Sequence, residues 1–105
     1  MKMTIYHHGG TTVAQDTDKP TLEEMQKRVG GYIQFCPLPR GCKGMLMVVN
    51  EDGLGLKLPY NAKASELYRL TWLKHHKAAD LDPNMMQLVG DVVVFEGTEE
   101  ELSEL

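Results

Sequence analysis

Long hydrophobic runs are absent from this 105-residue sequence. A membrane-spanning helix needs about 20 consecutive apolar residues, and no segment approaches that length. The first residues also lack the apolar stretch of a secretory signal peptide. Cysteine is scarce, since Cys36 and Cys42 are the only two, which is too few for a disulfide framework. We therefore expect a reduced, cytoplasmic protein that does not bind a membrane.

A strong charge of either sign is also lacking, because the formal net charge is −4 at pH 7. Five of the fifteen acids occupy the last ten residues, as Glu96, Glu99, Glu100, Glu101 and Glu104. The chain before them is nearly neutral and shows no clustered positive face of the kind that binds nucleic acid. We predict a single α+β domain over residues 1–95 and a solvated acidic C-terminal tail over residues 96–105. The alternative, in which the tail imitates nucleic acid and blocks a basic partner, stays open.

Two segments carry the end signals of α-helices. Thr21, with Glu24 three residues later, forms a capping-box pattern that begins a helix, and the Gly30-Gly31 pair ends it. Apolar residues recur between these ends at helical spacing. Asn61 is a favoured N-cap residue and predicts a second helix over residues 62–73.

Short apolar runs predict the strands. They cover residues 3–6, 11–15, 32–35, 45–49, 54–58 and 88–95. The Asp52-Gly53 pair predicts a tight hairpin between the fourth and fifth of these runs. The last run is too apolar for an exposed edge, so we place it in the middle of the sheet. The fold class that follows is α+β, an antiparallel or mixed sheet of about five strands with two helices packed on one face.

Several of these segments occur together in a known family. In chain order they are Leu22-Glu23-Glu24-Met25-Gln26, Val29-Gly30-Gly31-Tyr32-Ile33, Val49-Asn50-Glu51-Asp52-Gly53, Leu58-Pro59 with Asn61 and Ala64, Glu66-Leu67-Tyr68, and Val89-Gly90-Asp91-Val92-Val93. In this succession residues 21–95 resemble a family of short proteins of unknown function that is common in phages, plasmids and gut bacteria. The resemblance implies an α+β fold and an accessory gene of a mobile element. It brings no established activity and no functional residues.

Neither a catalytic constellation nor a metal site is expected. The adjacent histidines of His7-His8 and His75-His76 diverge on a strand or a helix, so neither pair chelates a metal alone. The Cys-x5-Cys spacing of Cys36 and Cys42 is not a usual zinc spacing. No sequence pattern places a base beside either thiol. We expect no catalytic residue, no metal ligand and no cofactor.

An anion site is the remaining candidate. Asn61 begins a helix whose free backbone N–H groups can bind a phosphate, and Lys57 and Lys63 lie close in sequence. Arg28 beside the glycine pair is another anion contact, and Tyr32 can stack on a base. These five residues are the predicted ligand-binding residues. The alternative is that Asn61 only caps the helix and that the lysines are solvated.

The function predicted from these features is a non-enzymatic binding protein of a phage or other mobile element, acting in the host cytoplasm. Its expected partner is a signalling nucleotide that it sequesters or a host defence protein that it blocks. We expect a homo-oligomer, because a short chain forms a deep pocket more easily between subunits. The alternatives are a small nucleic-acid-binding regulator and an undetected small enzyme.

Overall fold

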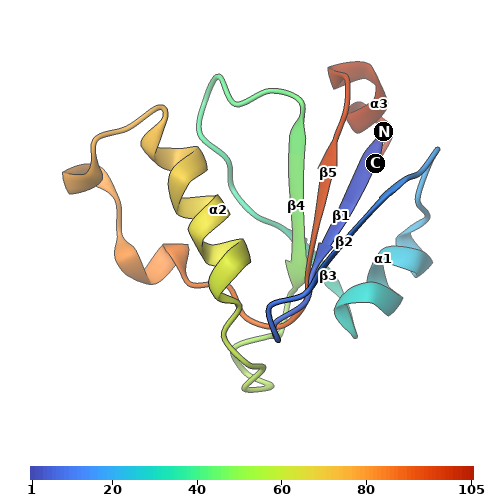
Figure 1. Cartoon of the computed structure of the whole chain (residues 1–105), viewed down its shortest axis with the longest axis horizontal. Coiled ribbons are helices and arrows are strands. Elements are labelled where there is room, and N and C mark those ends of the chain that lie inside the picture. The colour runs from blue at the N-terminus through green and yellow to red at the C-terminus, as the bar shows by residue number, and fades with distance from the viewer.

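The computed structural model describes all of residues 1–105. Five strands form one antiparallel sheet in the order β2-β1-β5-β4-β3 (Figure 1). The elements are β1 (Lys2–Tyr6), β2 (Thr12–Asp16), α1 (Leu22–Val29), β3 (Ile33–Phe35), β4 (Met45–Asn50), α2 (Ala62–Leu73), η1 (Ala78–Asp80), η2 (Pro83–Met86), β5 (Val92–Glu96) and α3 (Glu99–Ser103). The predicted α+β fold is confirmed, and so is the central position of the last strand. No helix of this structure is long and apolar enough to span a bilayer.

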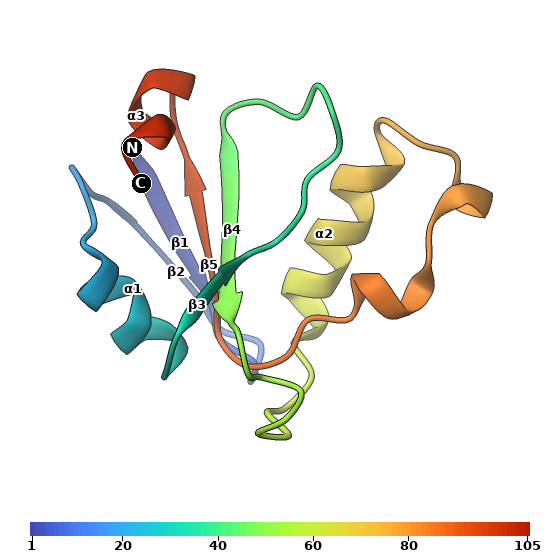
Figure 2. The same ribbon diagram turned by 180° about the vertical axis from the view of Figure 1, so that it is seen from behind.

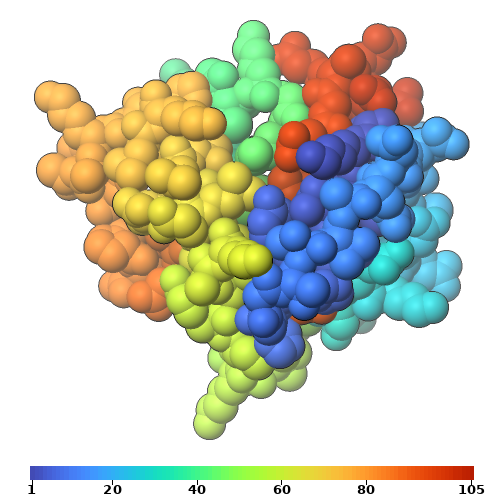
Figure 3. Space-filling model, viewed as in Figure 1, coloured from blue at the N-terminus to red at the C-terminus, as the bar shows by residue number.

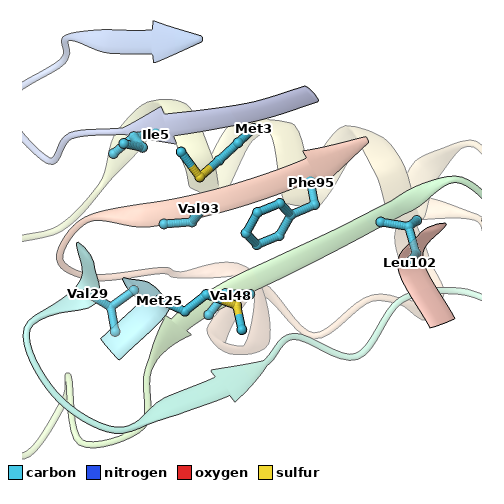
Figure 4. Packing of buried hydrophobic residues seen from close by; sticks show 8 residues of the cluster. All are labelled: Met3, Ile5, Met25, Val29, Val48, Val93, Phe95 and Leu102. Atoms are coloured by element: carbon cyan, nitrogen blue, oxygen red, sulfur yellow. The ribbon is translucent and has the colours of Figure 1, made fainter. Parts of the chain in front are cut away.

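One hydrophobic core lies on the face of the sheet that α1 covers. Residues of β1, β5 and β4 that point to this face meet the two buried residues of α1 and a leucine of α3 (Figure 4). The cluster consists of Met3, Ile5, Met25, Val29, Val48, Val93, Phe95 and Leu102. Alternation along the strands sends their other residues to the opposite face.

A second core lies on that opposite face, under α2. Its buried residues are Cys36, Met47, Ala64, Tyr68, Met86, Leu88, Val92 and Val94. The prediction that both helices pack on one face is therefore wrong, because α1 and α2 lie on opposite sides of the sheet (Figure 1). The physical reason is that the central strand β5 is apolar on both faces, and each face needs its own cover.

The helix ends follow their sequence signals. The Thr21 side chain accepts a hydrogen bond from the backbone N–H of Glu24 at 3.1 Å, and Gly30 ends α1 with a φ of 79°. A left-handed residue at this position favours glycine. Asn61 caps α2, where its side-chain oxygen accepts from the N–H of Ala64 at 3.1 Å. Both helix predictions are confirmed.

The prediction of a strand over residues 54–58 is wrong. Residues 51–57 form a succession of turns, held by backbone bonds such as Leu56 N–H to Asp52 O at 2.8 Å. The reason lies in the sheet, since β4 already has β3 on one side and β5 on the other. A strand returning directly from β4 therefore has no free edge to pair with.

Residues 96–105 contact the body through Leu102, while Glu99, Glu100 and Glu104 are exposed. Glu96 ends β5, and Leu102 on α3 is only 8% exposed. The Thr98 backbone N–H and the ammonium of Met1, each 3.0 Å from a Glu101 carboxylate oxygen, lower the pKa of Glu101 to about 2. The acidic segment thus joins the two chain ends beside the sheet.

Candidate functional site

The edge of the sheet at β3 carries a concentration of exposed apolar side chains. β3 pairs only with β4, so its other edge faces solvent. Figure 2 shows β3 in front, with α1 on one side and α2 on the other. The exposed apolar side chains on and beside this strand are Leu22 (55%), Tyr32 (68%), Phe35 (41%), Leu54 (78%) and Met85 (54%). We call these five residues the β3-edge surface.

A first groove lies beside β3 on the α1 side of the sheet. It has a volume of about 400 Å³ and is lined by Leu22 and Met25 of α1, by Ile33 and Phe35 of β3, and by Leu105. These side chains come from three separate parts of the chain. Because α1 is amphipathic, Met25 is buried in the core while Leu22, on another side of the helix, lies at the rim of the groove.

A second groove lies beside the same strand on the α2 side. Its volume is about 180 Å³, and Gln34, Val49, Leu54 and Met85 contribute to its lining. Glu51 is its one acidic residue. The two grooves together flank one free sheet edge, which is an arrangement suited to binding another polypeptide.

The second groove is lined by a hydrogen-bonded tyrosine and by a buried cysteine. The Tyr68 hydroxyl donates to the carbonyl of Pro37 at 2.5 Å, and the Trp72 Nε1–H donates to the same oxygen at 3.3 Å. Cys36 also lines this groove, and burial raises the pKa of its thiol to about 12. A thiol with such a pKa stays protonated at neutral pH and is a poor nucleophile.

Asn50 fixes the turn that presents Leu54. Its Oδ1 accepts from the N–H of Asp52 at 2.8 Å, and its Nδ2 donates to the carbonyl of Val29 at 3.1 Å. The turn is thereby tied to the C-terminal end of α1. Gly53 is buried in the same turn, where an added Cβ would lie 2.9 Å from a methyl group of Val89. The Asn50 hydrogen bonds and the close packing of Gly53 thus hold the turn in which Leu54 is exposed.

Asn61 does not offer its polar atoms to a ligand. The residue is 1% exposed, and its Nδ2 donates to the carbonyls of Tyr6 at 2.7 Å and Gly90 at 2.8 Å. Its Oδ1 is taken by the cap of α2. Lys63 is exposed on the first turn of that helix, and Lys57 lies in the preceding turns with a φ of 55°.

The other two predicted ligand-binding residues lie apart from these. Tyr32 belongs to the β3-edge surface, where its carbonyl accepts from the N–H of Glu51 at 2.8 Å. Arg28 lines a hollow of about 500 Å³ with Lys27, His7 and Glu24. None of the five pockets described for this chain contains two of the five predicted residues. The structure does not gather them into one site.

The histidines and the second cysteine lie on two different parts of the surface. His7 Nδ1 is 3.0 Å from Oδ2 of Asp91, and Oδ1 of the same carboxylate accepts from the N–H of His8 at 3.1 Å. Cys42 and His75 line a shallow polar hollow of about 300 Å³. No group of three or more His, Cys, Asp or Glu side chains lies close enough to hold a metal ion.

Sequence reasoning missed most of the β3-edge surface. The sequence analysis placed Leu54 in a strand and Leu22 in the first predicted helix, and neither was identified as a surface residue. The available signal was Gly53-Leu54-Gly55-Leu56, since leucines between glycines are poorly suited to a regular strand. Met85 belongs to η2, a short 3-10 helix that no hydrophobic periodicity in the sequence predicts.

The fold and the surface together define a small α+β protein with a free sheet edge that has a groove on each side. The chain belongs to a family described as a domain of unknown function, DUF3846, whose model matches residues 1–105. The predicted membership of a family of unknown function is confirmed. No curated protein and no solved structure matches the chain.

Proposed function

We propose that this chain is a non-enzymatic binding protein of a phage or other mobile element, which blocks a host defence protein through the β3-edge surface. The observation that carries the proposal is the exposure of Leu54, at 78%, on the rim of an apolar groove beside a free strand edge. Exposed apolar patches of this kind are typical of protein–protein interaction sites.

Energetics support the same assignment. Complete burial of an exposed leucine side chain contributes roughly 1.5–3 kcal/mol. A few such residues near the centre of a contact carry most of the affinity of a protein complex. The hydrogen bonds of Asn50 hold the turn that carries Leu54, and a groove lies beside this leucine. A partner that covers Leu54 therefore gains this free energy without first ordering the turn.

The test is affinity capture from a host lysate with the wild-type chain, Leu54→Gln and Leu70→Gln. Leu70 is 46% exposed on α2 and serves as the matched control. We expect a captured defence protein whose affinity falls about tenfold or more with Leu54→Gln, as a loss of at least 1.4 kcal/mol requires. Leu70→Gln should bind like the wild type, and the captured protein should lose its own activity in the complex.

Equal capture by the wild type and Leu54→Gln would overturn the proposal, and so would a captured protein that keeps full activity when bound. Leu54 is exposed and belongs to neither hydrophobic core, so Leu54→Gln should remain folded. A loss of capture by this variant therefore reports on binding and not on unfolding.

A second candidate function is the binding of a phosphate-bearing nucleotide in the hollow of His7, Lys27 and Arg28. The specific observation is that Asp91 holds the His7 ring beside two cationic side chains at one hollow, with Glu24 as the only acid among its lining residues. Calorimetry with cyclic and ADP-ribose-type nucleotides tests it. Heat that disappears with Arg28→Gln but not with Lys63→Gln would favour this function, and no heat from any nucleotide would exclude it.

A further inference from the structure

The second free edge of the sheet, at β2, is exposed along its whole length. All five residues of Thr12–Asp16 are exposed. Figure 3 views this side of the molecule, where no other segment covers the blue atoms of the N-terminal hairpin. β2 therefore presents both of its faces and its outer edge to solvent.

The backbone register shows which groups on this edge are unpaired. His7 N–H donates to Thr11 O, and Thr17 N–H donates to Met1 O, each at 2.9 Å. In an antiparallel pair the hydrogen-bonding residues alternate along each strand. The N–H and C=O groups of alternate β2 residues, namely Thr12, Ala14 and Asp16, consequently point away from β1.

β2 also lacks the features that protect sheet edges from pairing. Common protections are proline, lysine, a bulge or a very short strand. β2 contains no proline and no basic residue, and its register with β1 runs without a bulge over five pairs. β3 differs, because it has three residues and is followed closely by Pro37 and Pro39.

We propose that β2 pairs antiparallel with β2 of a second copy of this chain, about a two-fold axis at Ala14. This goes beyond the proposed function, which concerns the other edge of the sheet. The pairing joins the two sheets into one continuous sheet through about six new backbone hydrogen bonds. Ala14 then lies opposite Ala14 of the partner subunit, and Asp16 lies opposite Thr12 of the partner subunit.

The side chains are complementary in this register. Asp16 is the only charged residue of β2, and the hydroxyl opposite it can donate to its carboxylate. Val13, which is 44% exposed, lies opposite the aliphatic part of a glutamine. A register centred on Asp16 would instead place two carboxylates opposite each other, which is destabilising. The register centred on Ala14 therefore pairs the outward N–H and C=O groups of Thr12, Ala14 and Asp16 and places no like charges opposite each other.

The dimer leaves the two β3-edge surfaces at the far ends of the joined sheet. β2 and β3 are at opposite ends of the strand order, so pairing at β2 covers nothing at β3. Each dimer thus carries two copies of the surface proposed above, which allows one complex to engage two partner molecules.

Sedimentation velocity on the purified full chain over a concentration series tests the proposal. We expect a concentration-dependent shift from the 11.8 kDa monomer to twice that mass. Ala14→Pro should abolish the shift without unfolding the monomer, because the amide it removes points away from β1. Ala14→Lys should abolish it too, whereas Ala79→Lys, the same change at an exposed alanine of η1, should not.

Cysteine cross-linking tests the register, with Cys42→Ser as background. Ala14→Cys should form a disulfide dimer under mild oxidation, because hydrogen-bonded antiparallel pairs have Cα atoms about 5.5 Å apart. Val13→Cys should not, because its two copies would be diagonal neighbours about 7–8 Å apart. A monomer at every concentration would overturn the proposal, as would a dimer that persists in Ala14→Lys or a cross-link at residue 13 but not at residue 14.

Discussion

Replacement of Asn61 by alanine should destabilise the protein strongly, although the sequence suggested a ligand-binding role. The side chain caps α2 and donates to two carbonyls, those of Tyr6 and Gly90. Loss of an N-cap residue costs about 1 kcal/mol. Leaving a buried carbonyl without its donor costs about 1–3 kcal/mol more.

These terms give an expected loss of about 2–4 kcal/mol in the free energy of unfolding for Asn61→Ala. For a domain of this size each 1 kcal/mol lowers Tm by roughly 4–8 °C, so the drop in Tm should exceed roughly 8 °C. Urea denaturation followed by circular dichroism measures the free energy, and calorimetry measures Tm. The carbonyl of Tyr6 lies at the end of β1, so β1, β5 and α2 should loosen together.

The matched control is Asn84→Ala, because Asn84 is exposed and its side chain makes no hydrogen bond; its backbone N–H, which the substitution keeps, donates to Asp82. It should change stability by less than about 0.5 kcal/mol. A loss below about 1 kcal/mol for Asn61→Ala would refute the reasoning, since it would fall short of the cap term alone. An unchanged stability combined with lost ligand binding would restore the ligand-binding role.

Three further predictions concern the C-terminal helix, a buried glycine and the two thiols. The pKa of Glu101 is lowered in the folded state to about 2, so its contribution to stability is present above the pKa of the unfolded chain, near 4.5. It should be lost as pH falls from that value toward 2, and Glu101→Gln should remove this part of the pH dependence in urea titrations. Gly53→Ala should destabilise the protein by about 1–3 kcal/mol, because the added Cβ would lie too close to a methyl group of Val89. Gly55→Ala should be tolerated, because the nearest atom to its added Cβ is 3.5 Å away. Thermal melts of the two variants test this difference. Cys42 should react with a thiol reagent in the native protein and Cys36 only after unfolding, and equal labelling rates would contradict the burial of Cys36.

The candidate site was only partly predictable, and Tyr32 shows the limit. Its position after the glycine pair was visible in the sequence, but the prediction paired it with distant cations as a base-stacking residue. The structure pairs its backbone with Glu51, directly after β4, and leaves its side chain 68% exposed. Which strand becomes an edge depends on long-range pairing, and a single sequence does not encode the strand order in any local pattern.

Local signals determined the helices and most strands. A threonine or asparagine cap and a left-handed glycine act within one turn, so the starts of α1 and α2 and the end of α1 were readable from neighbouring residues. The uninterrupted apolar run of β5 also revealed its central place, because only a strand covered on both faces is apolar throughout.

Tertiary packing decided the rest. Pairing of β4 with both β3 and β5 left residues 54–58 without an edge and turned Leu54 into a surface residue. The two apolar faces of the sheet are covered by α1 and α2 on opposite sides, and burial of Leu102 packs α3 against the first core. These outcomes depend on contacts between residues far apart in sequence, whose free energy is gained only when the whole sheet is assembled.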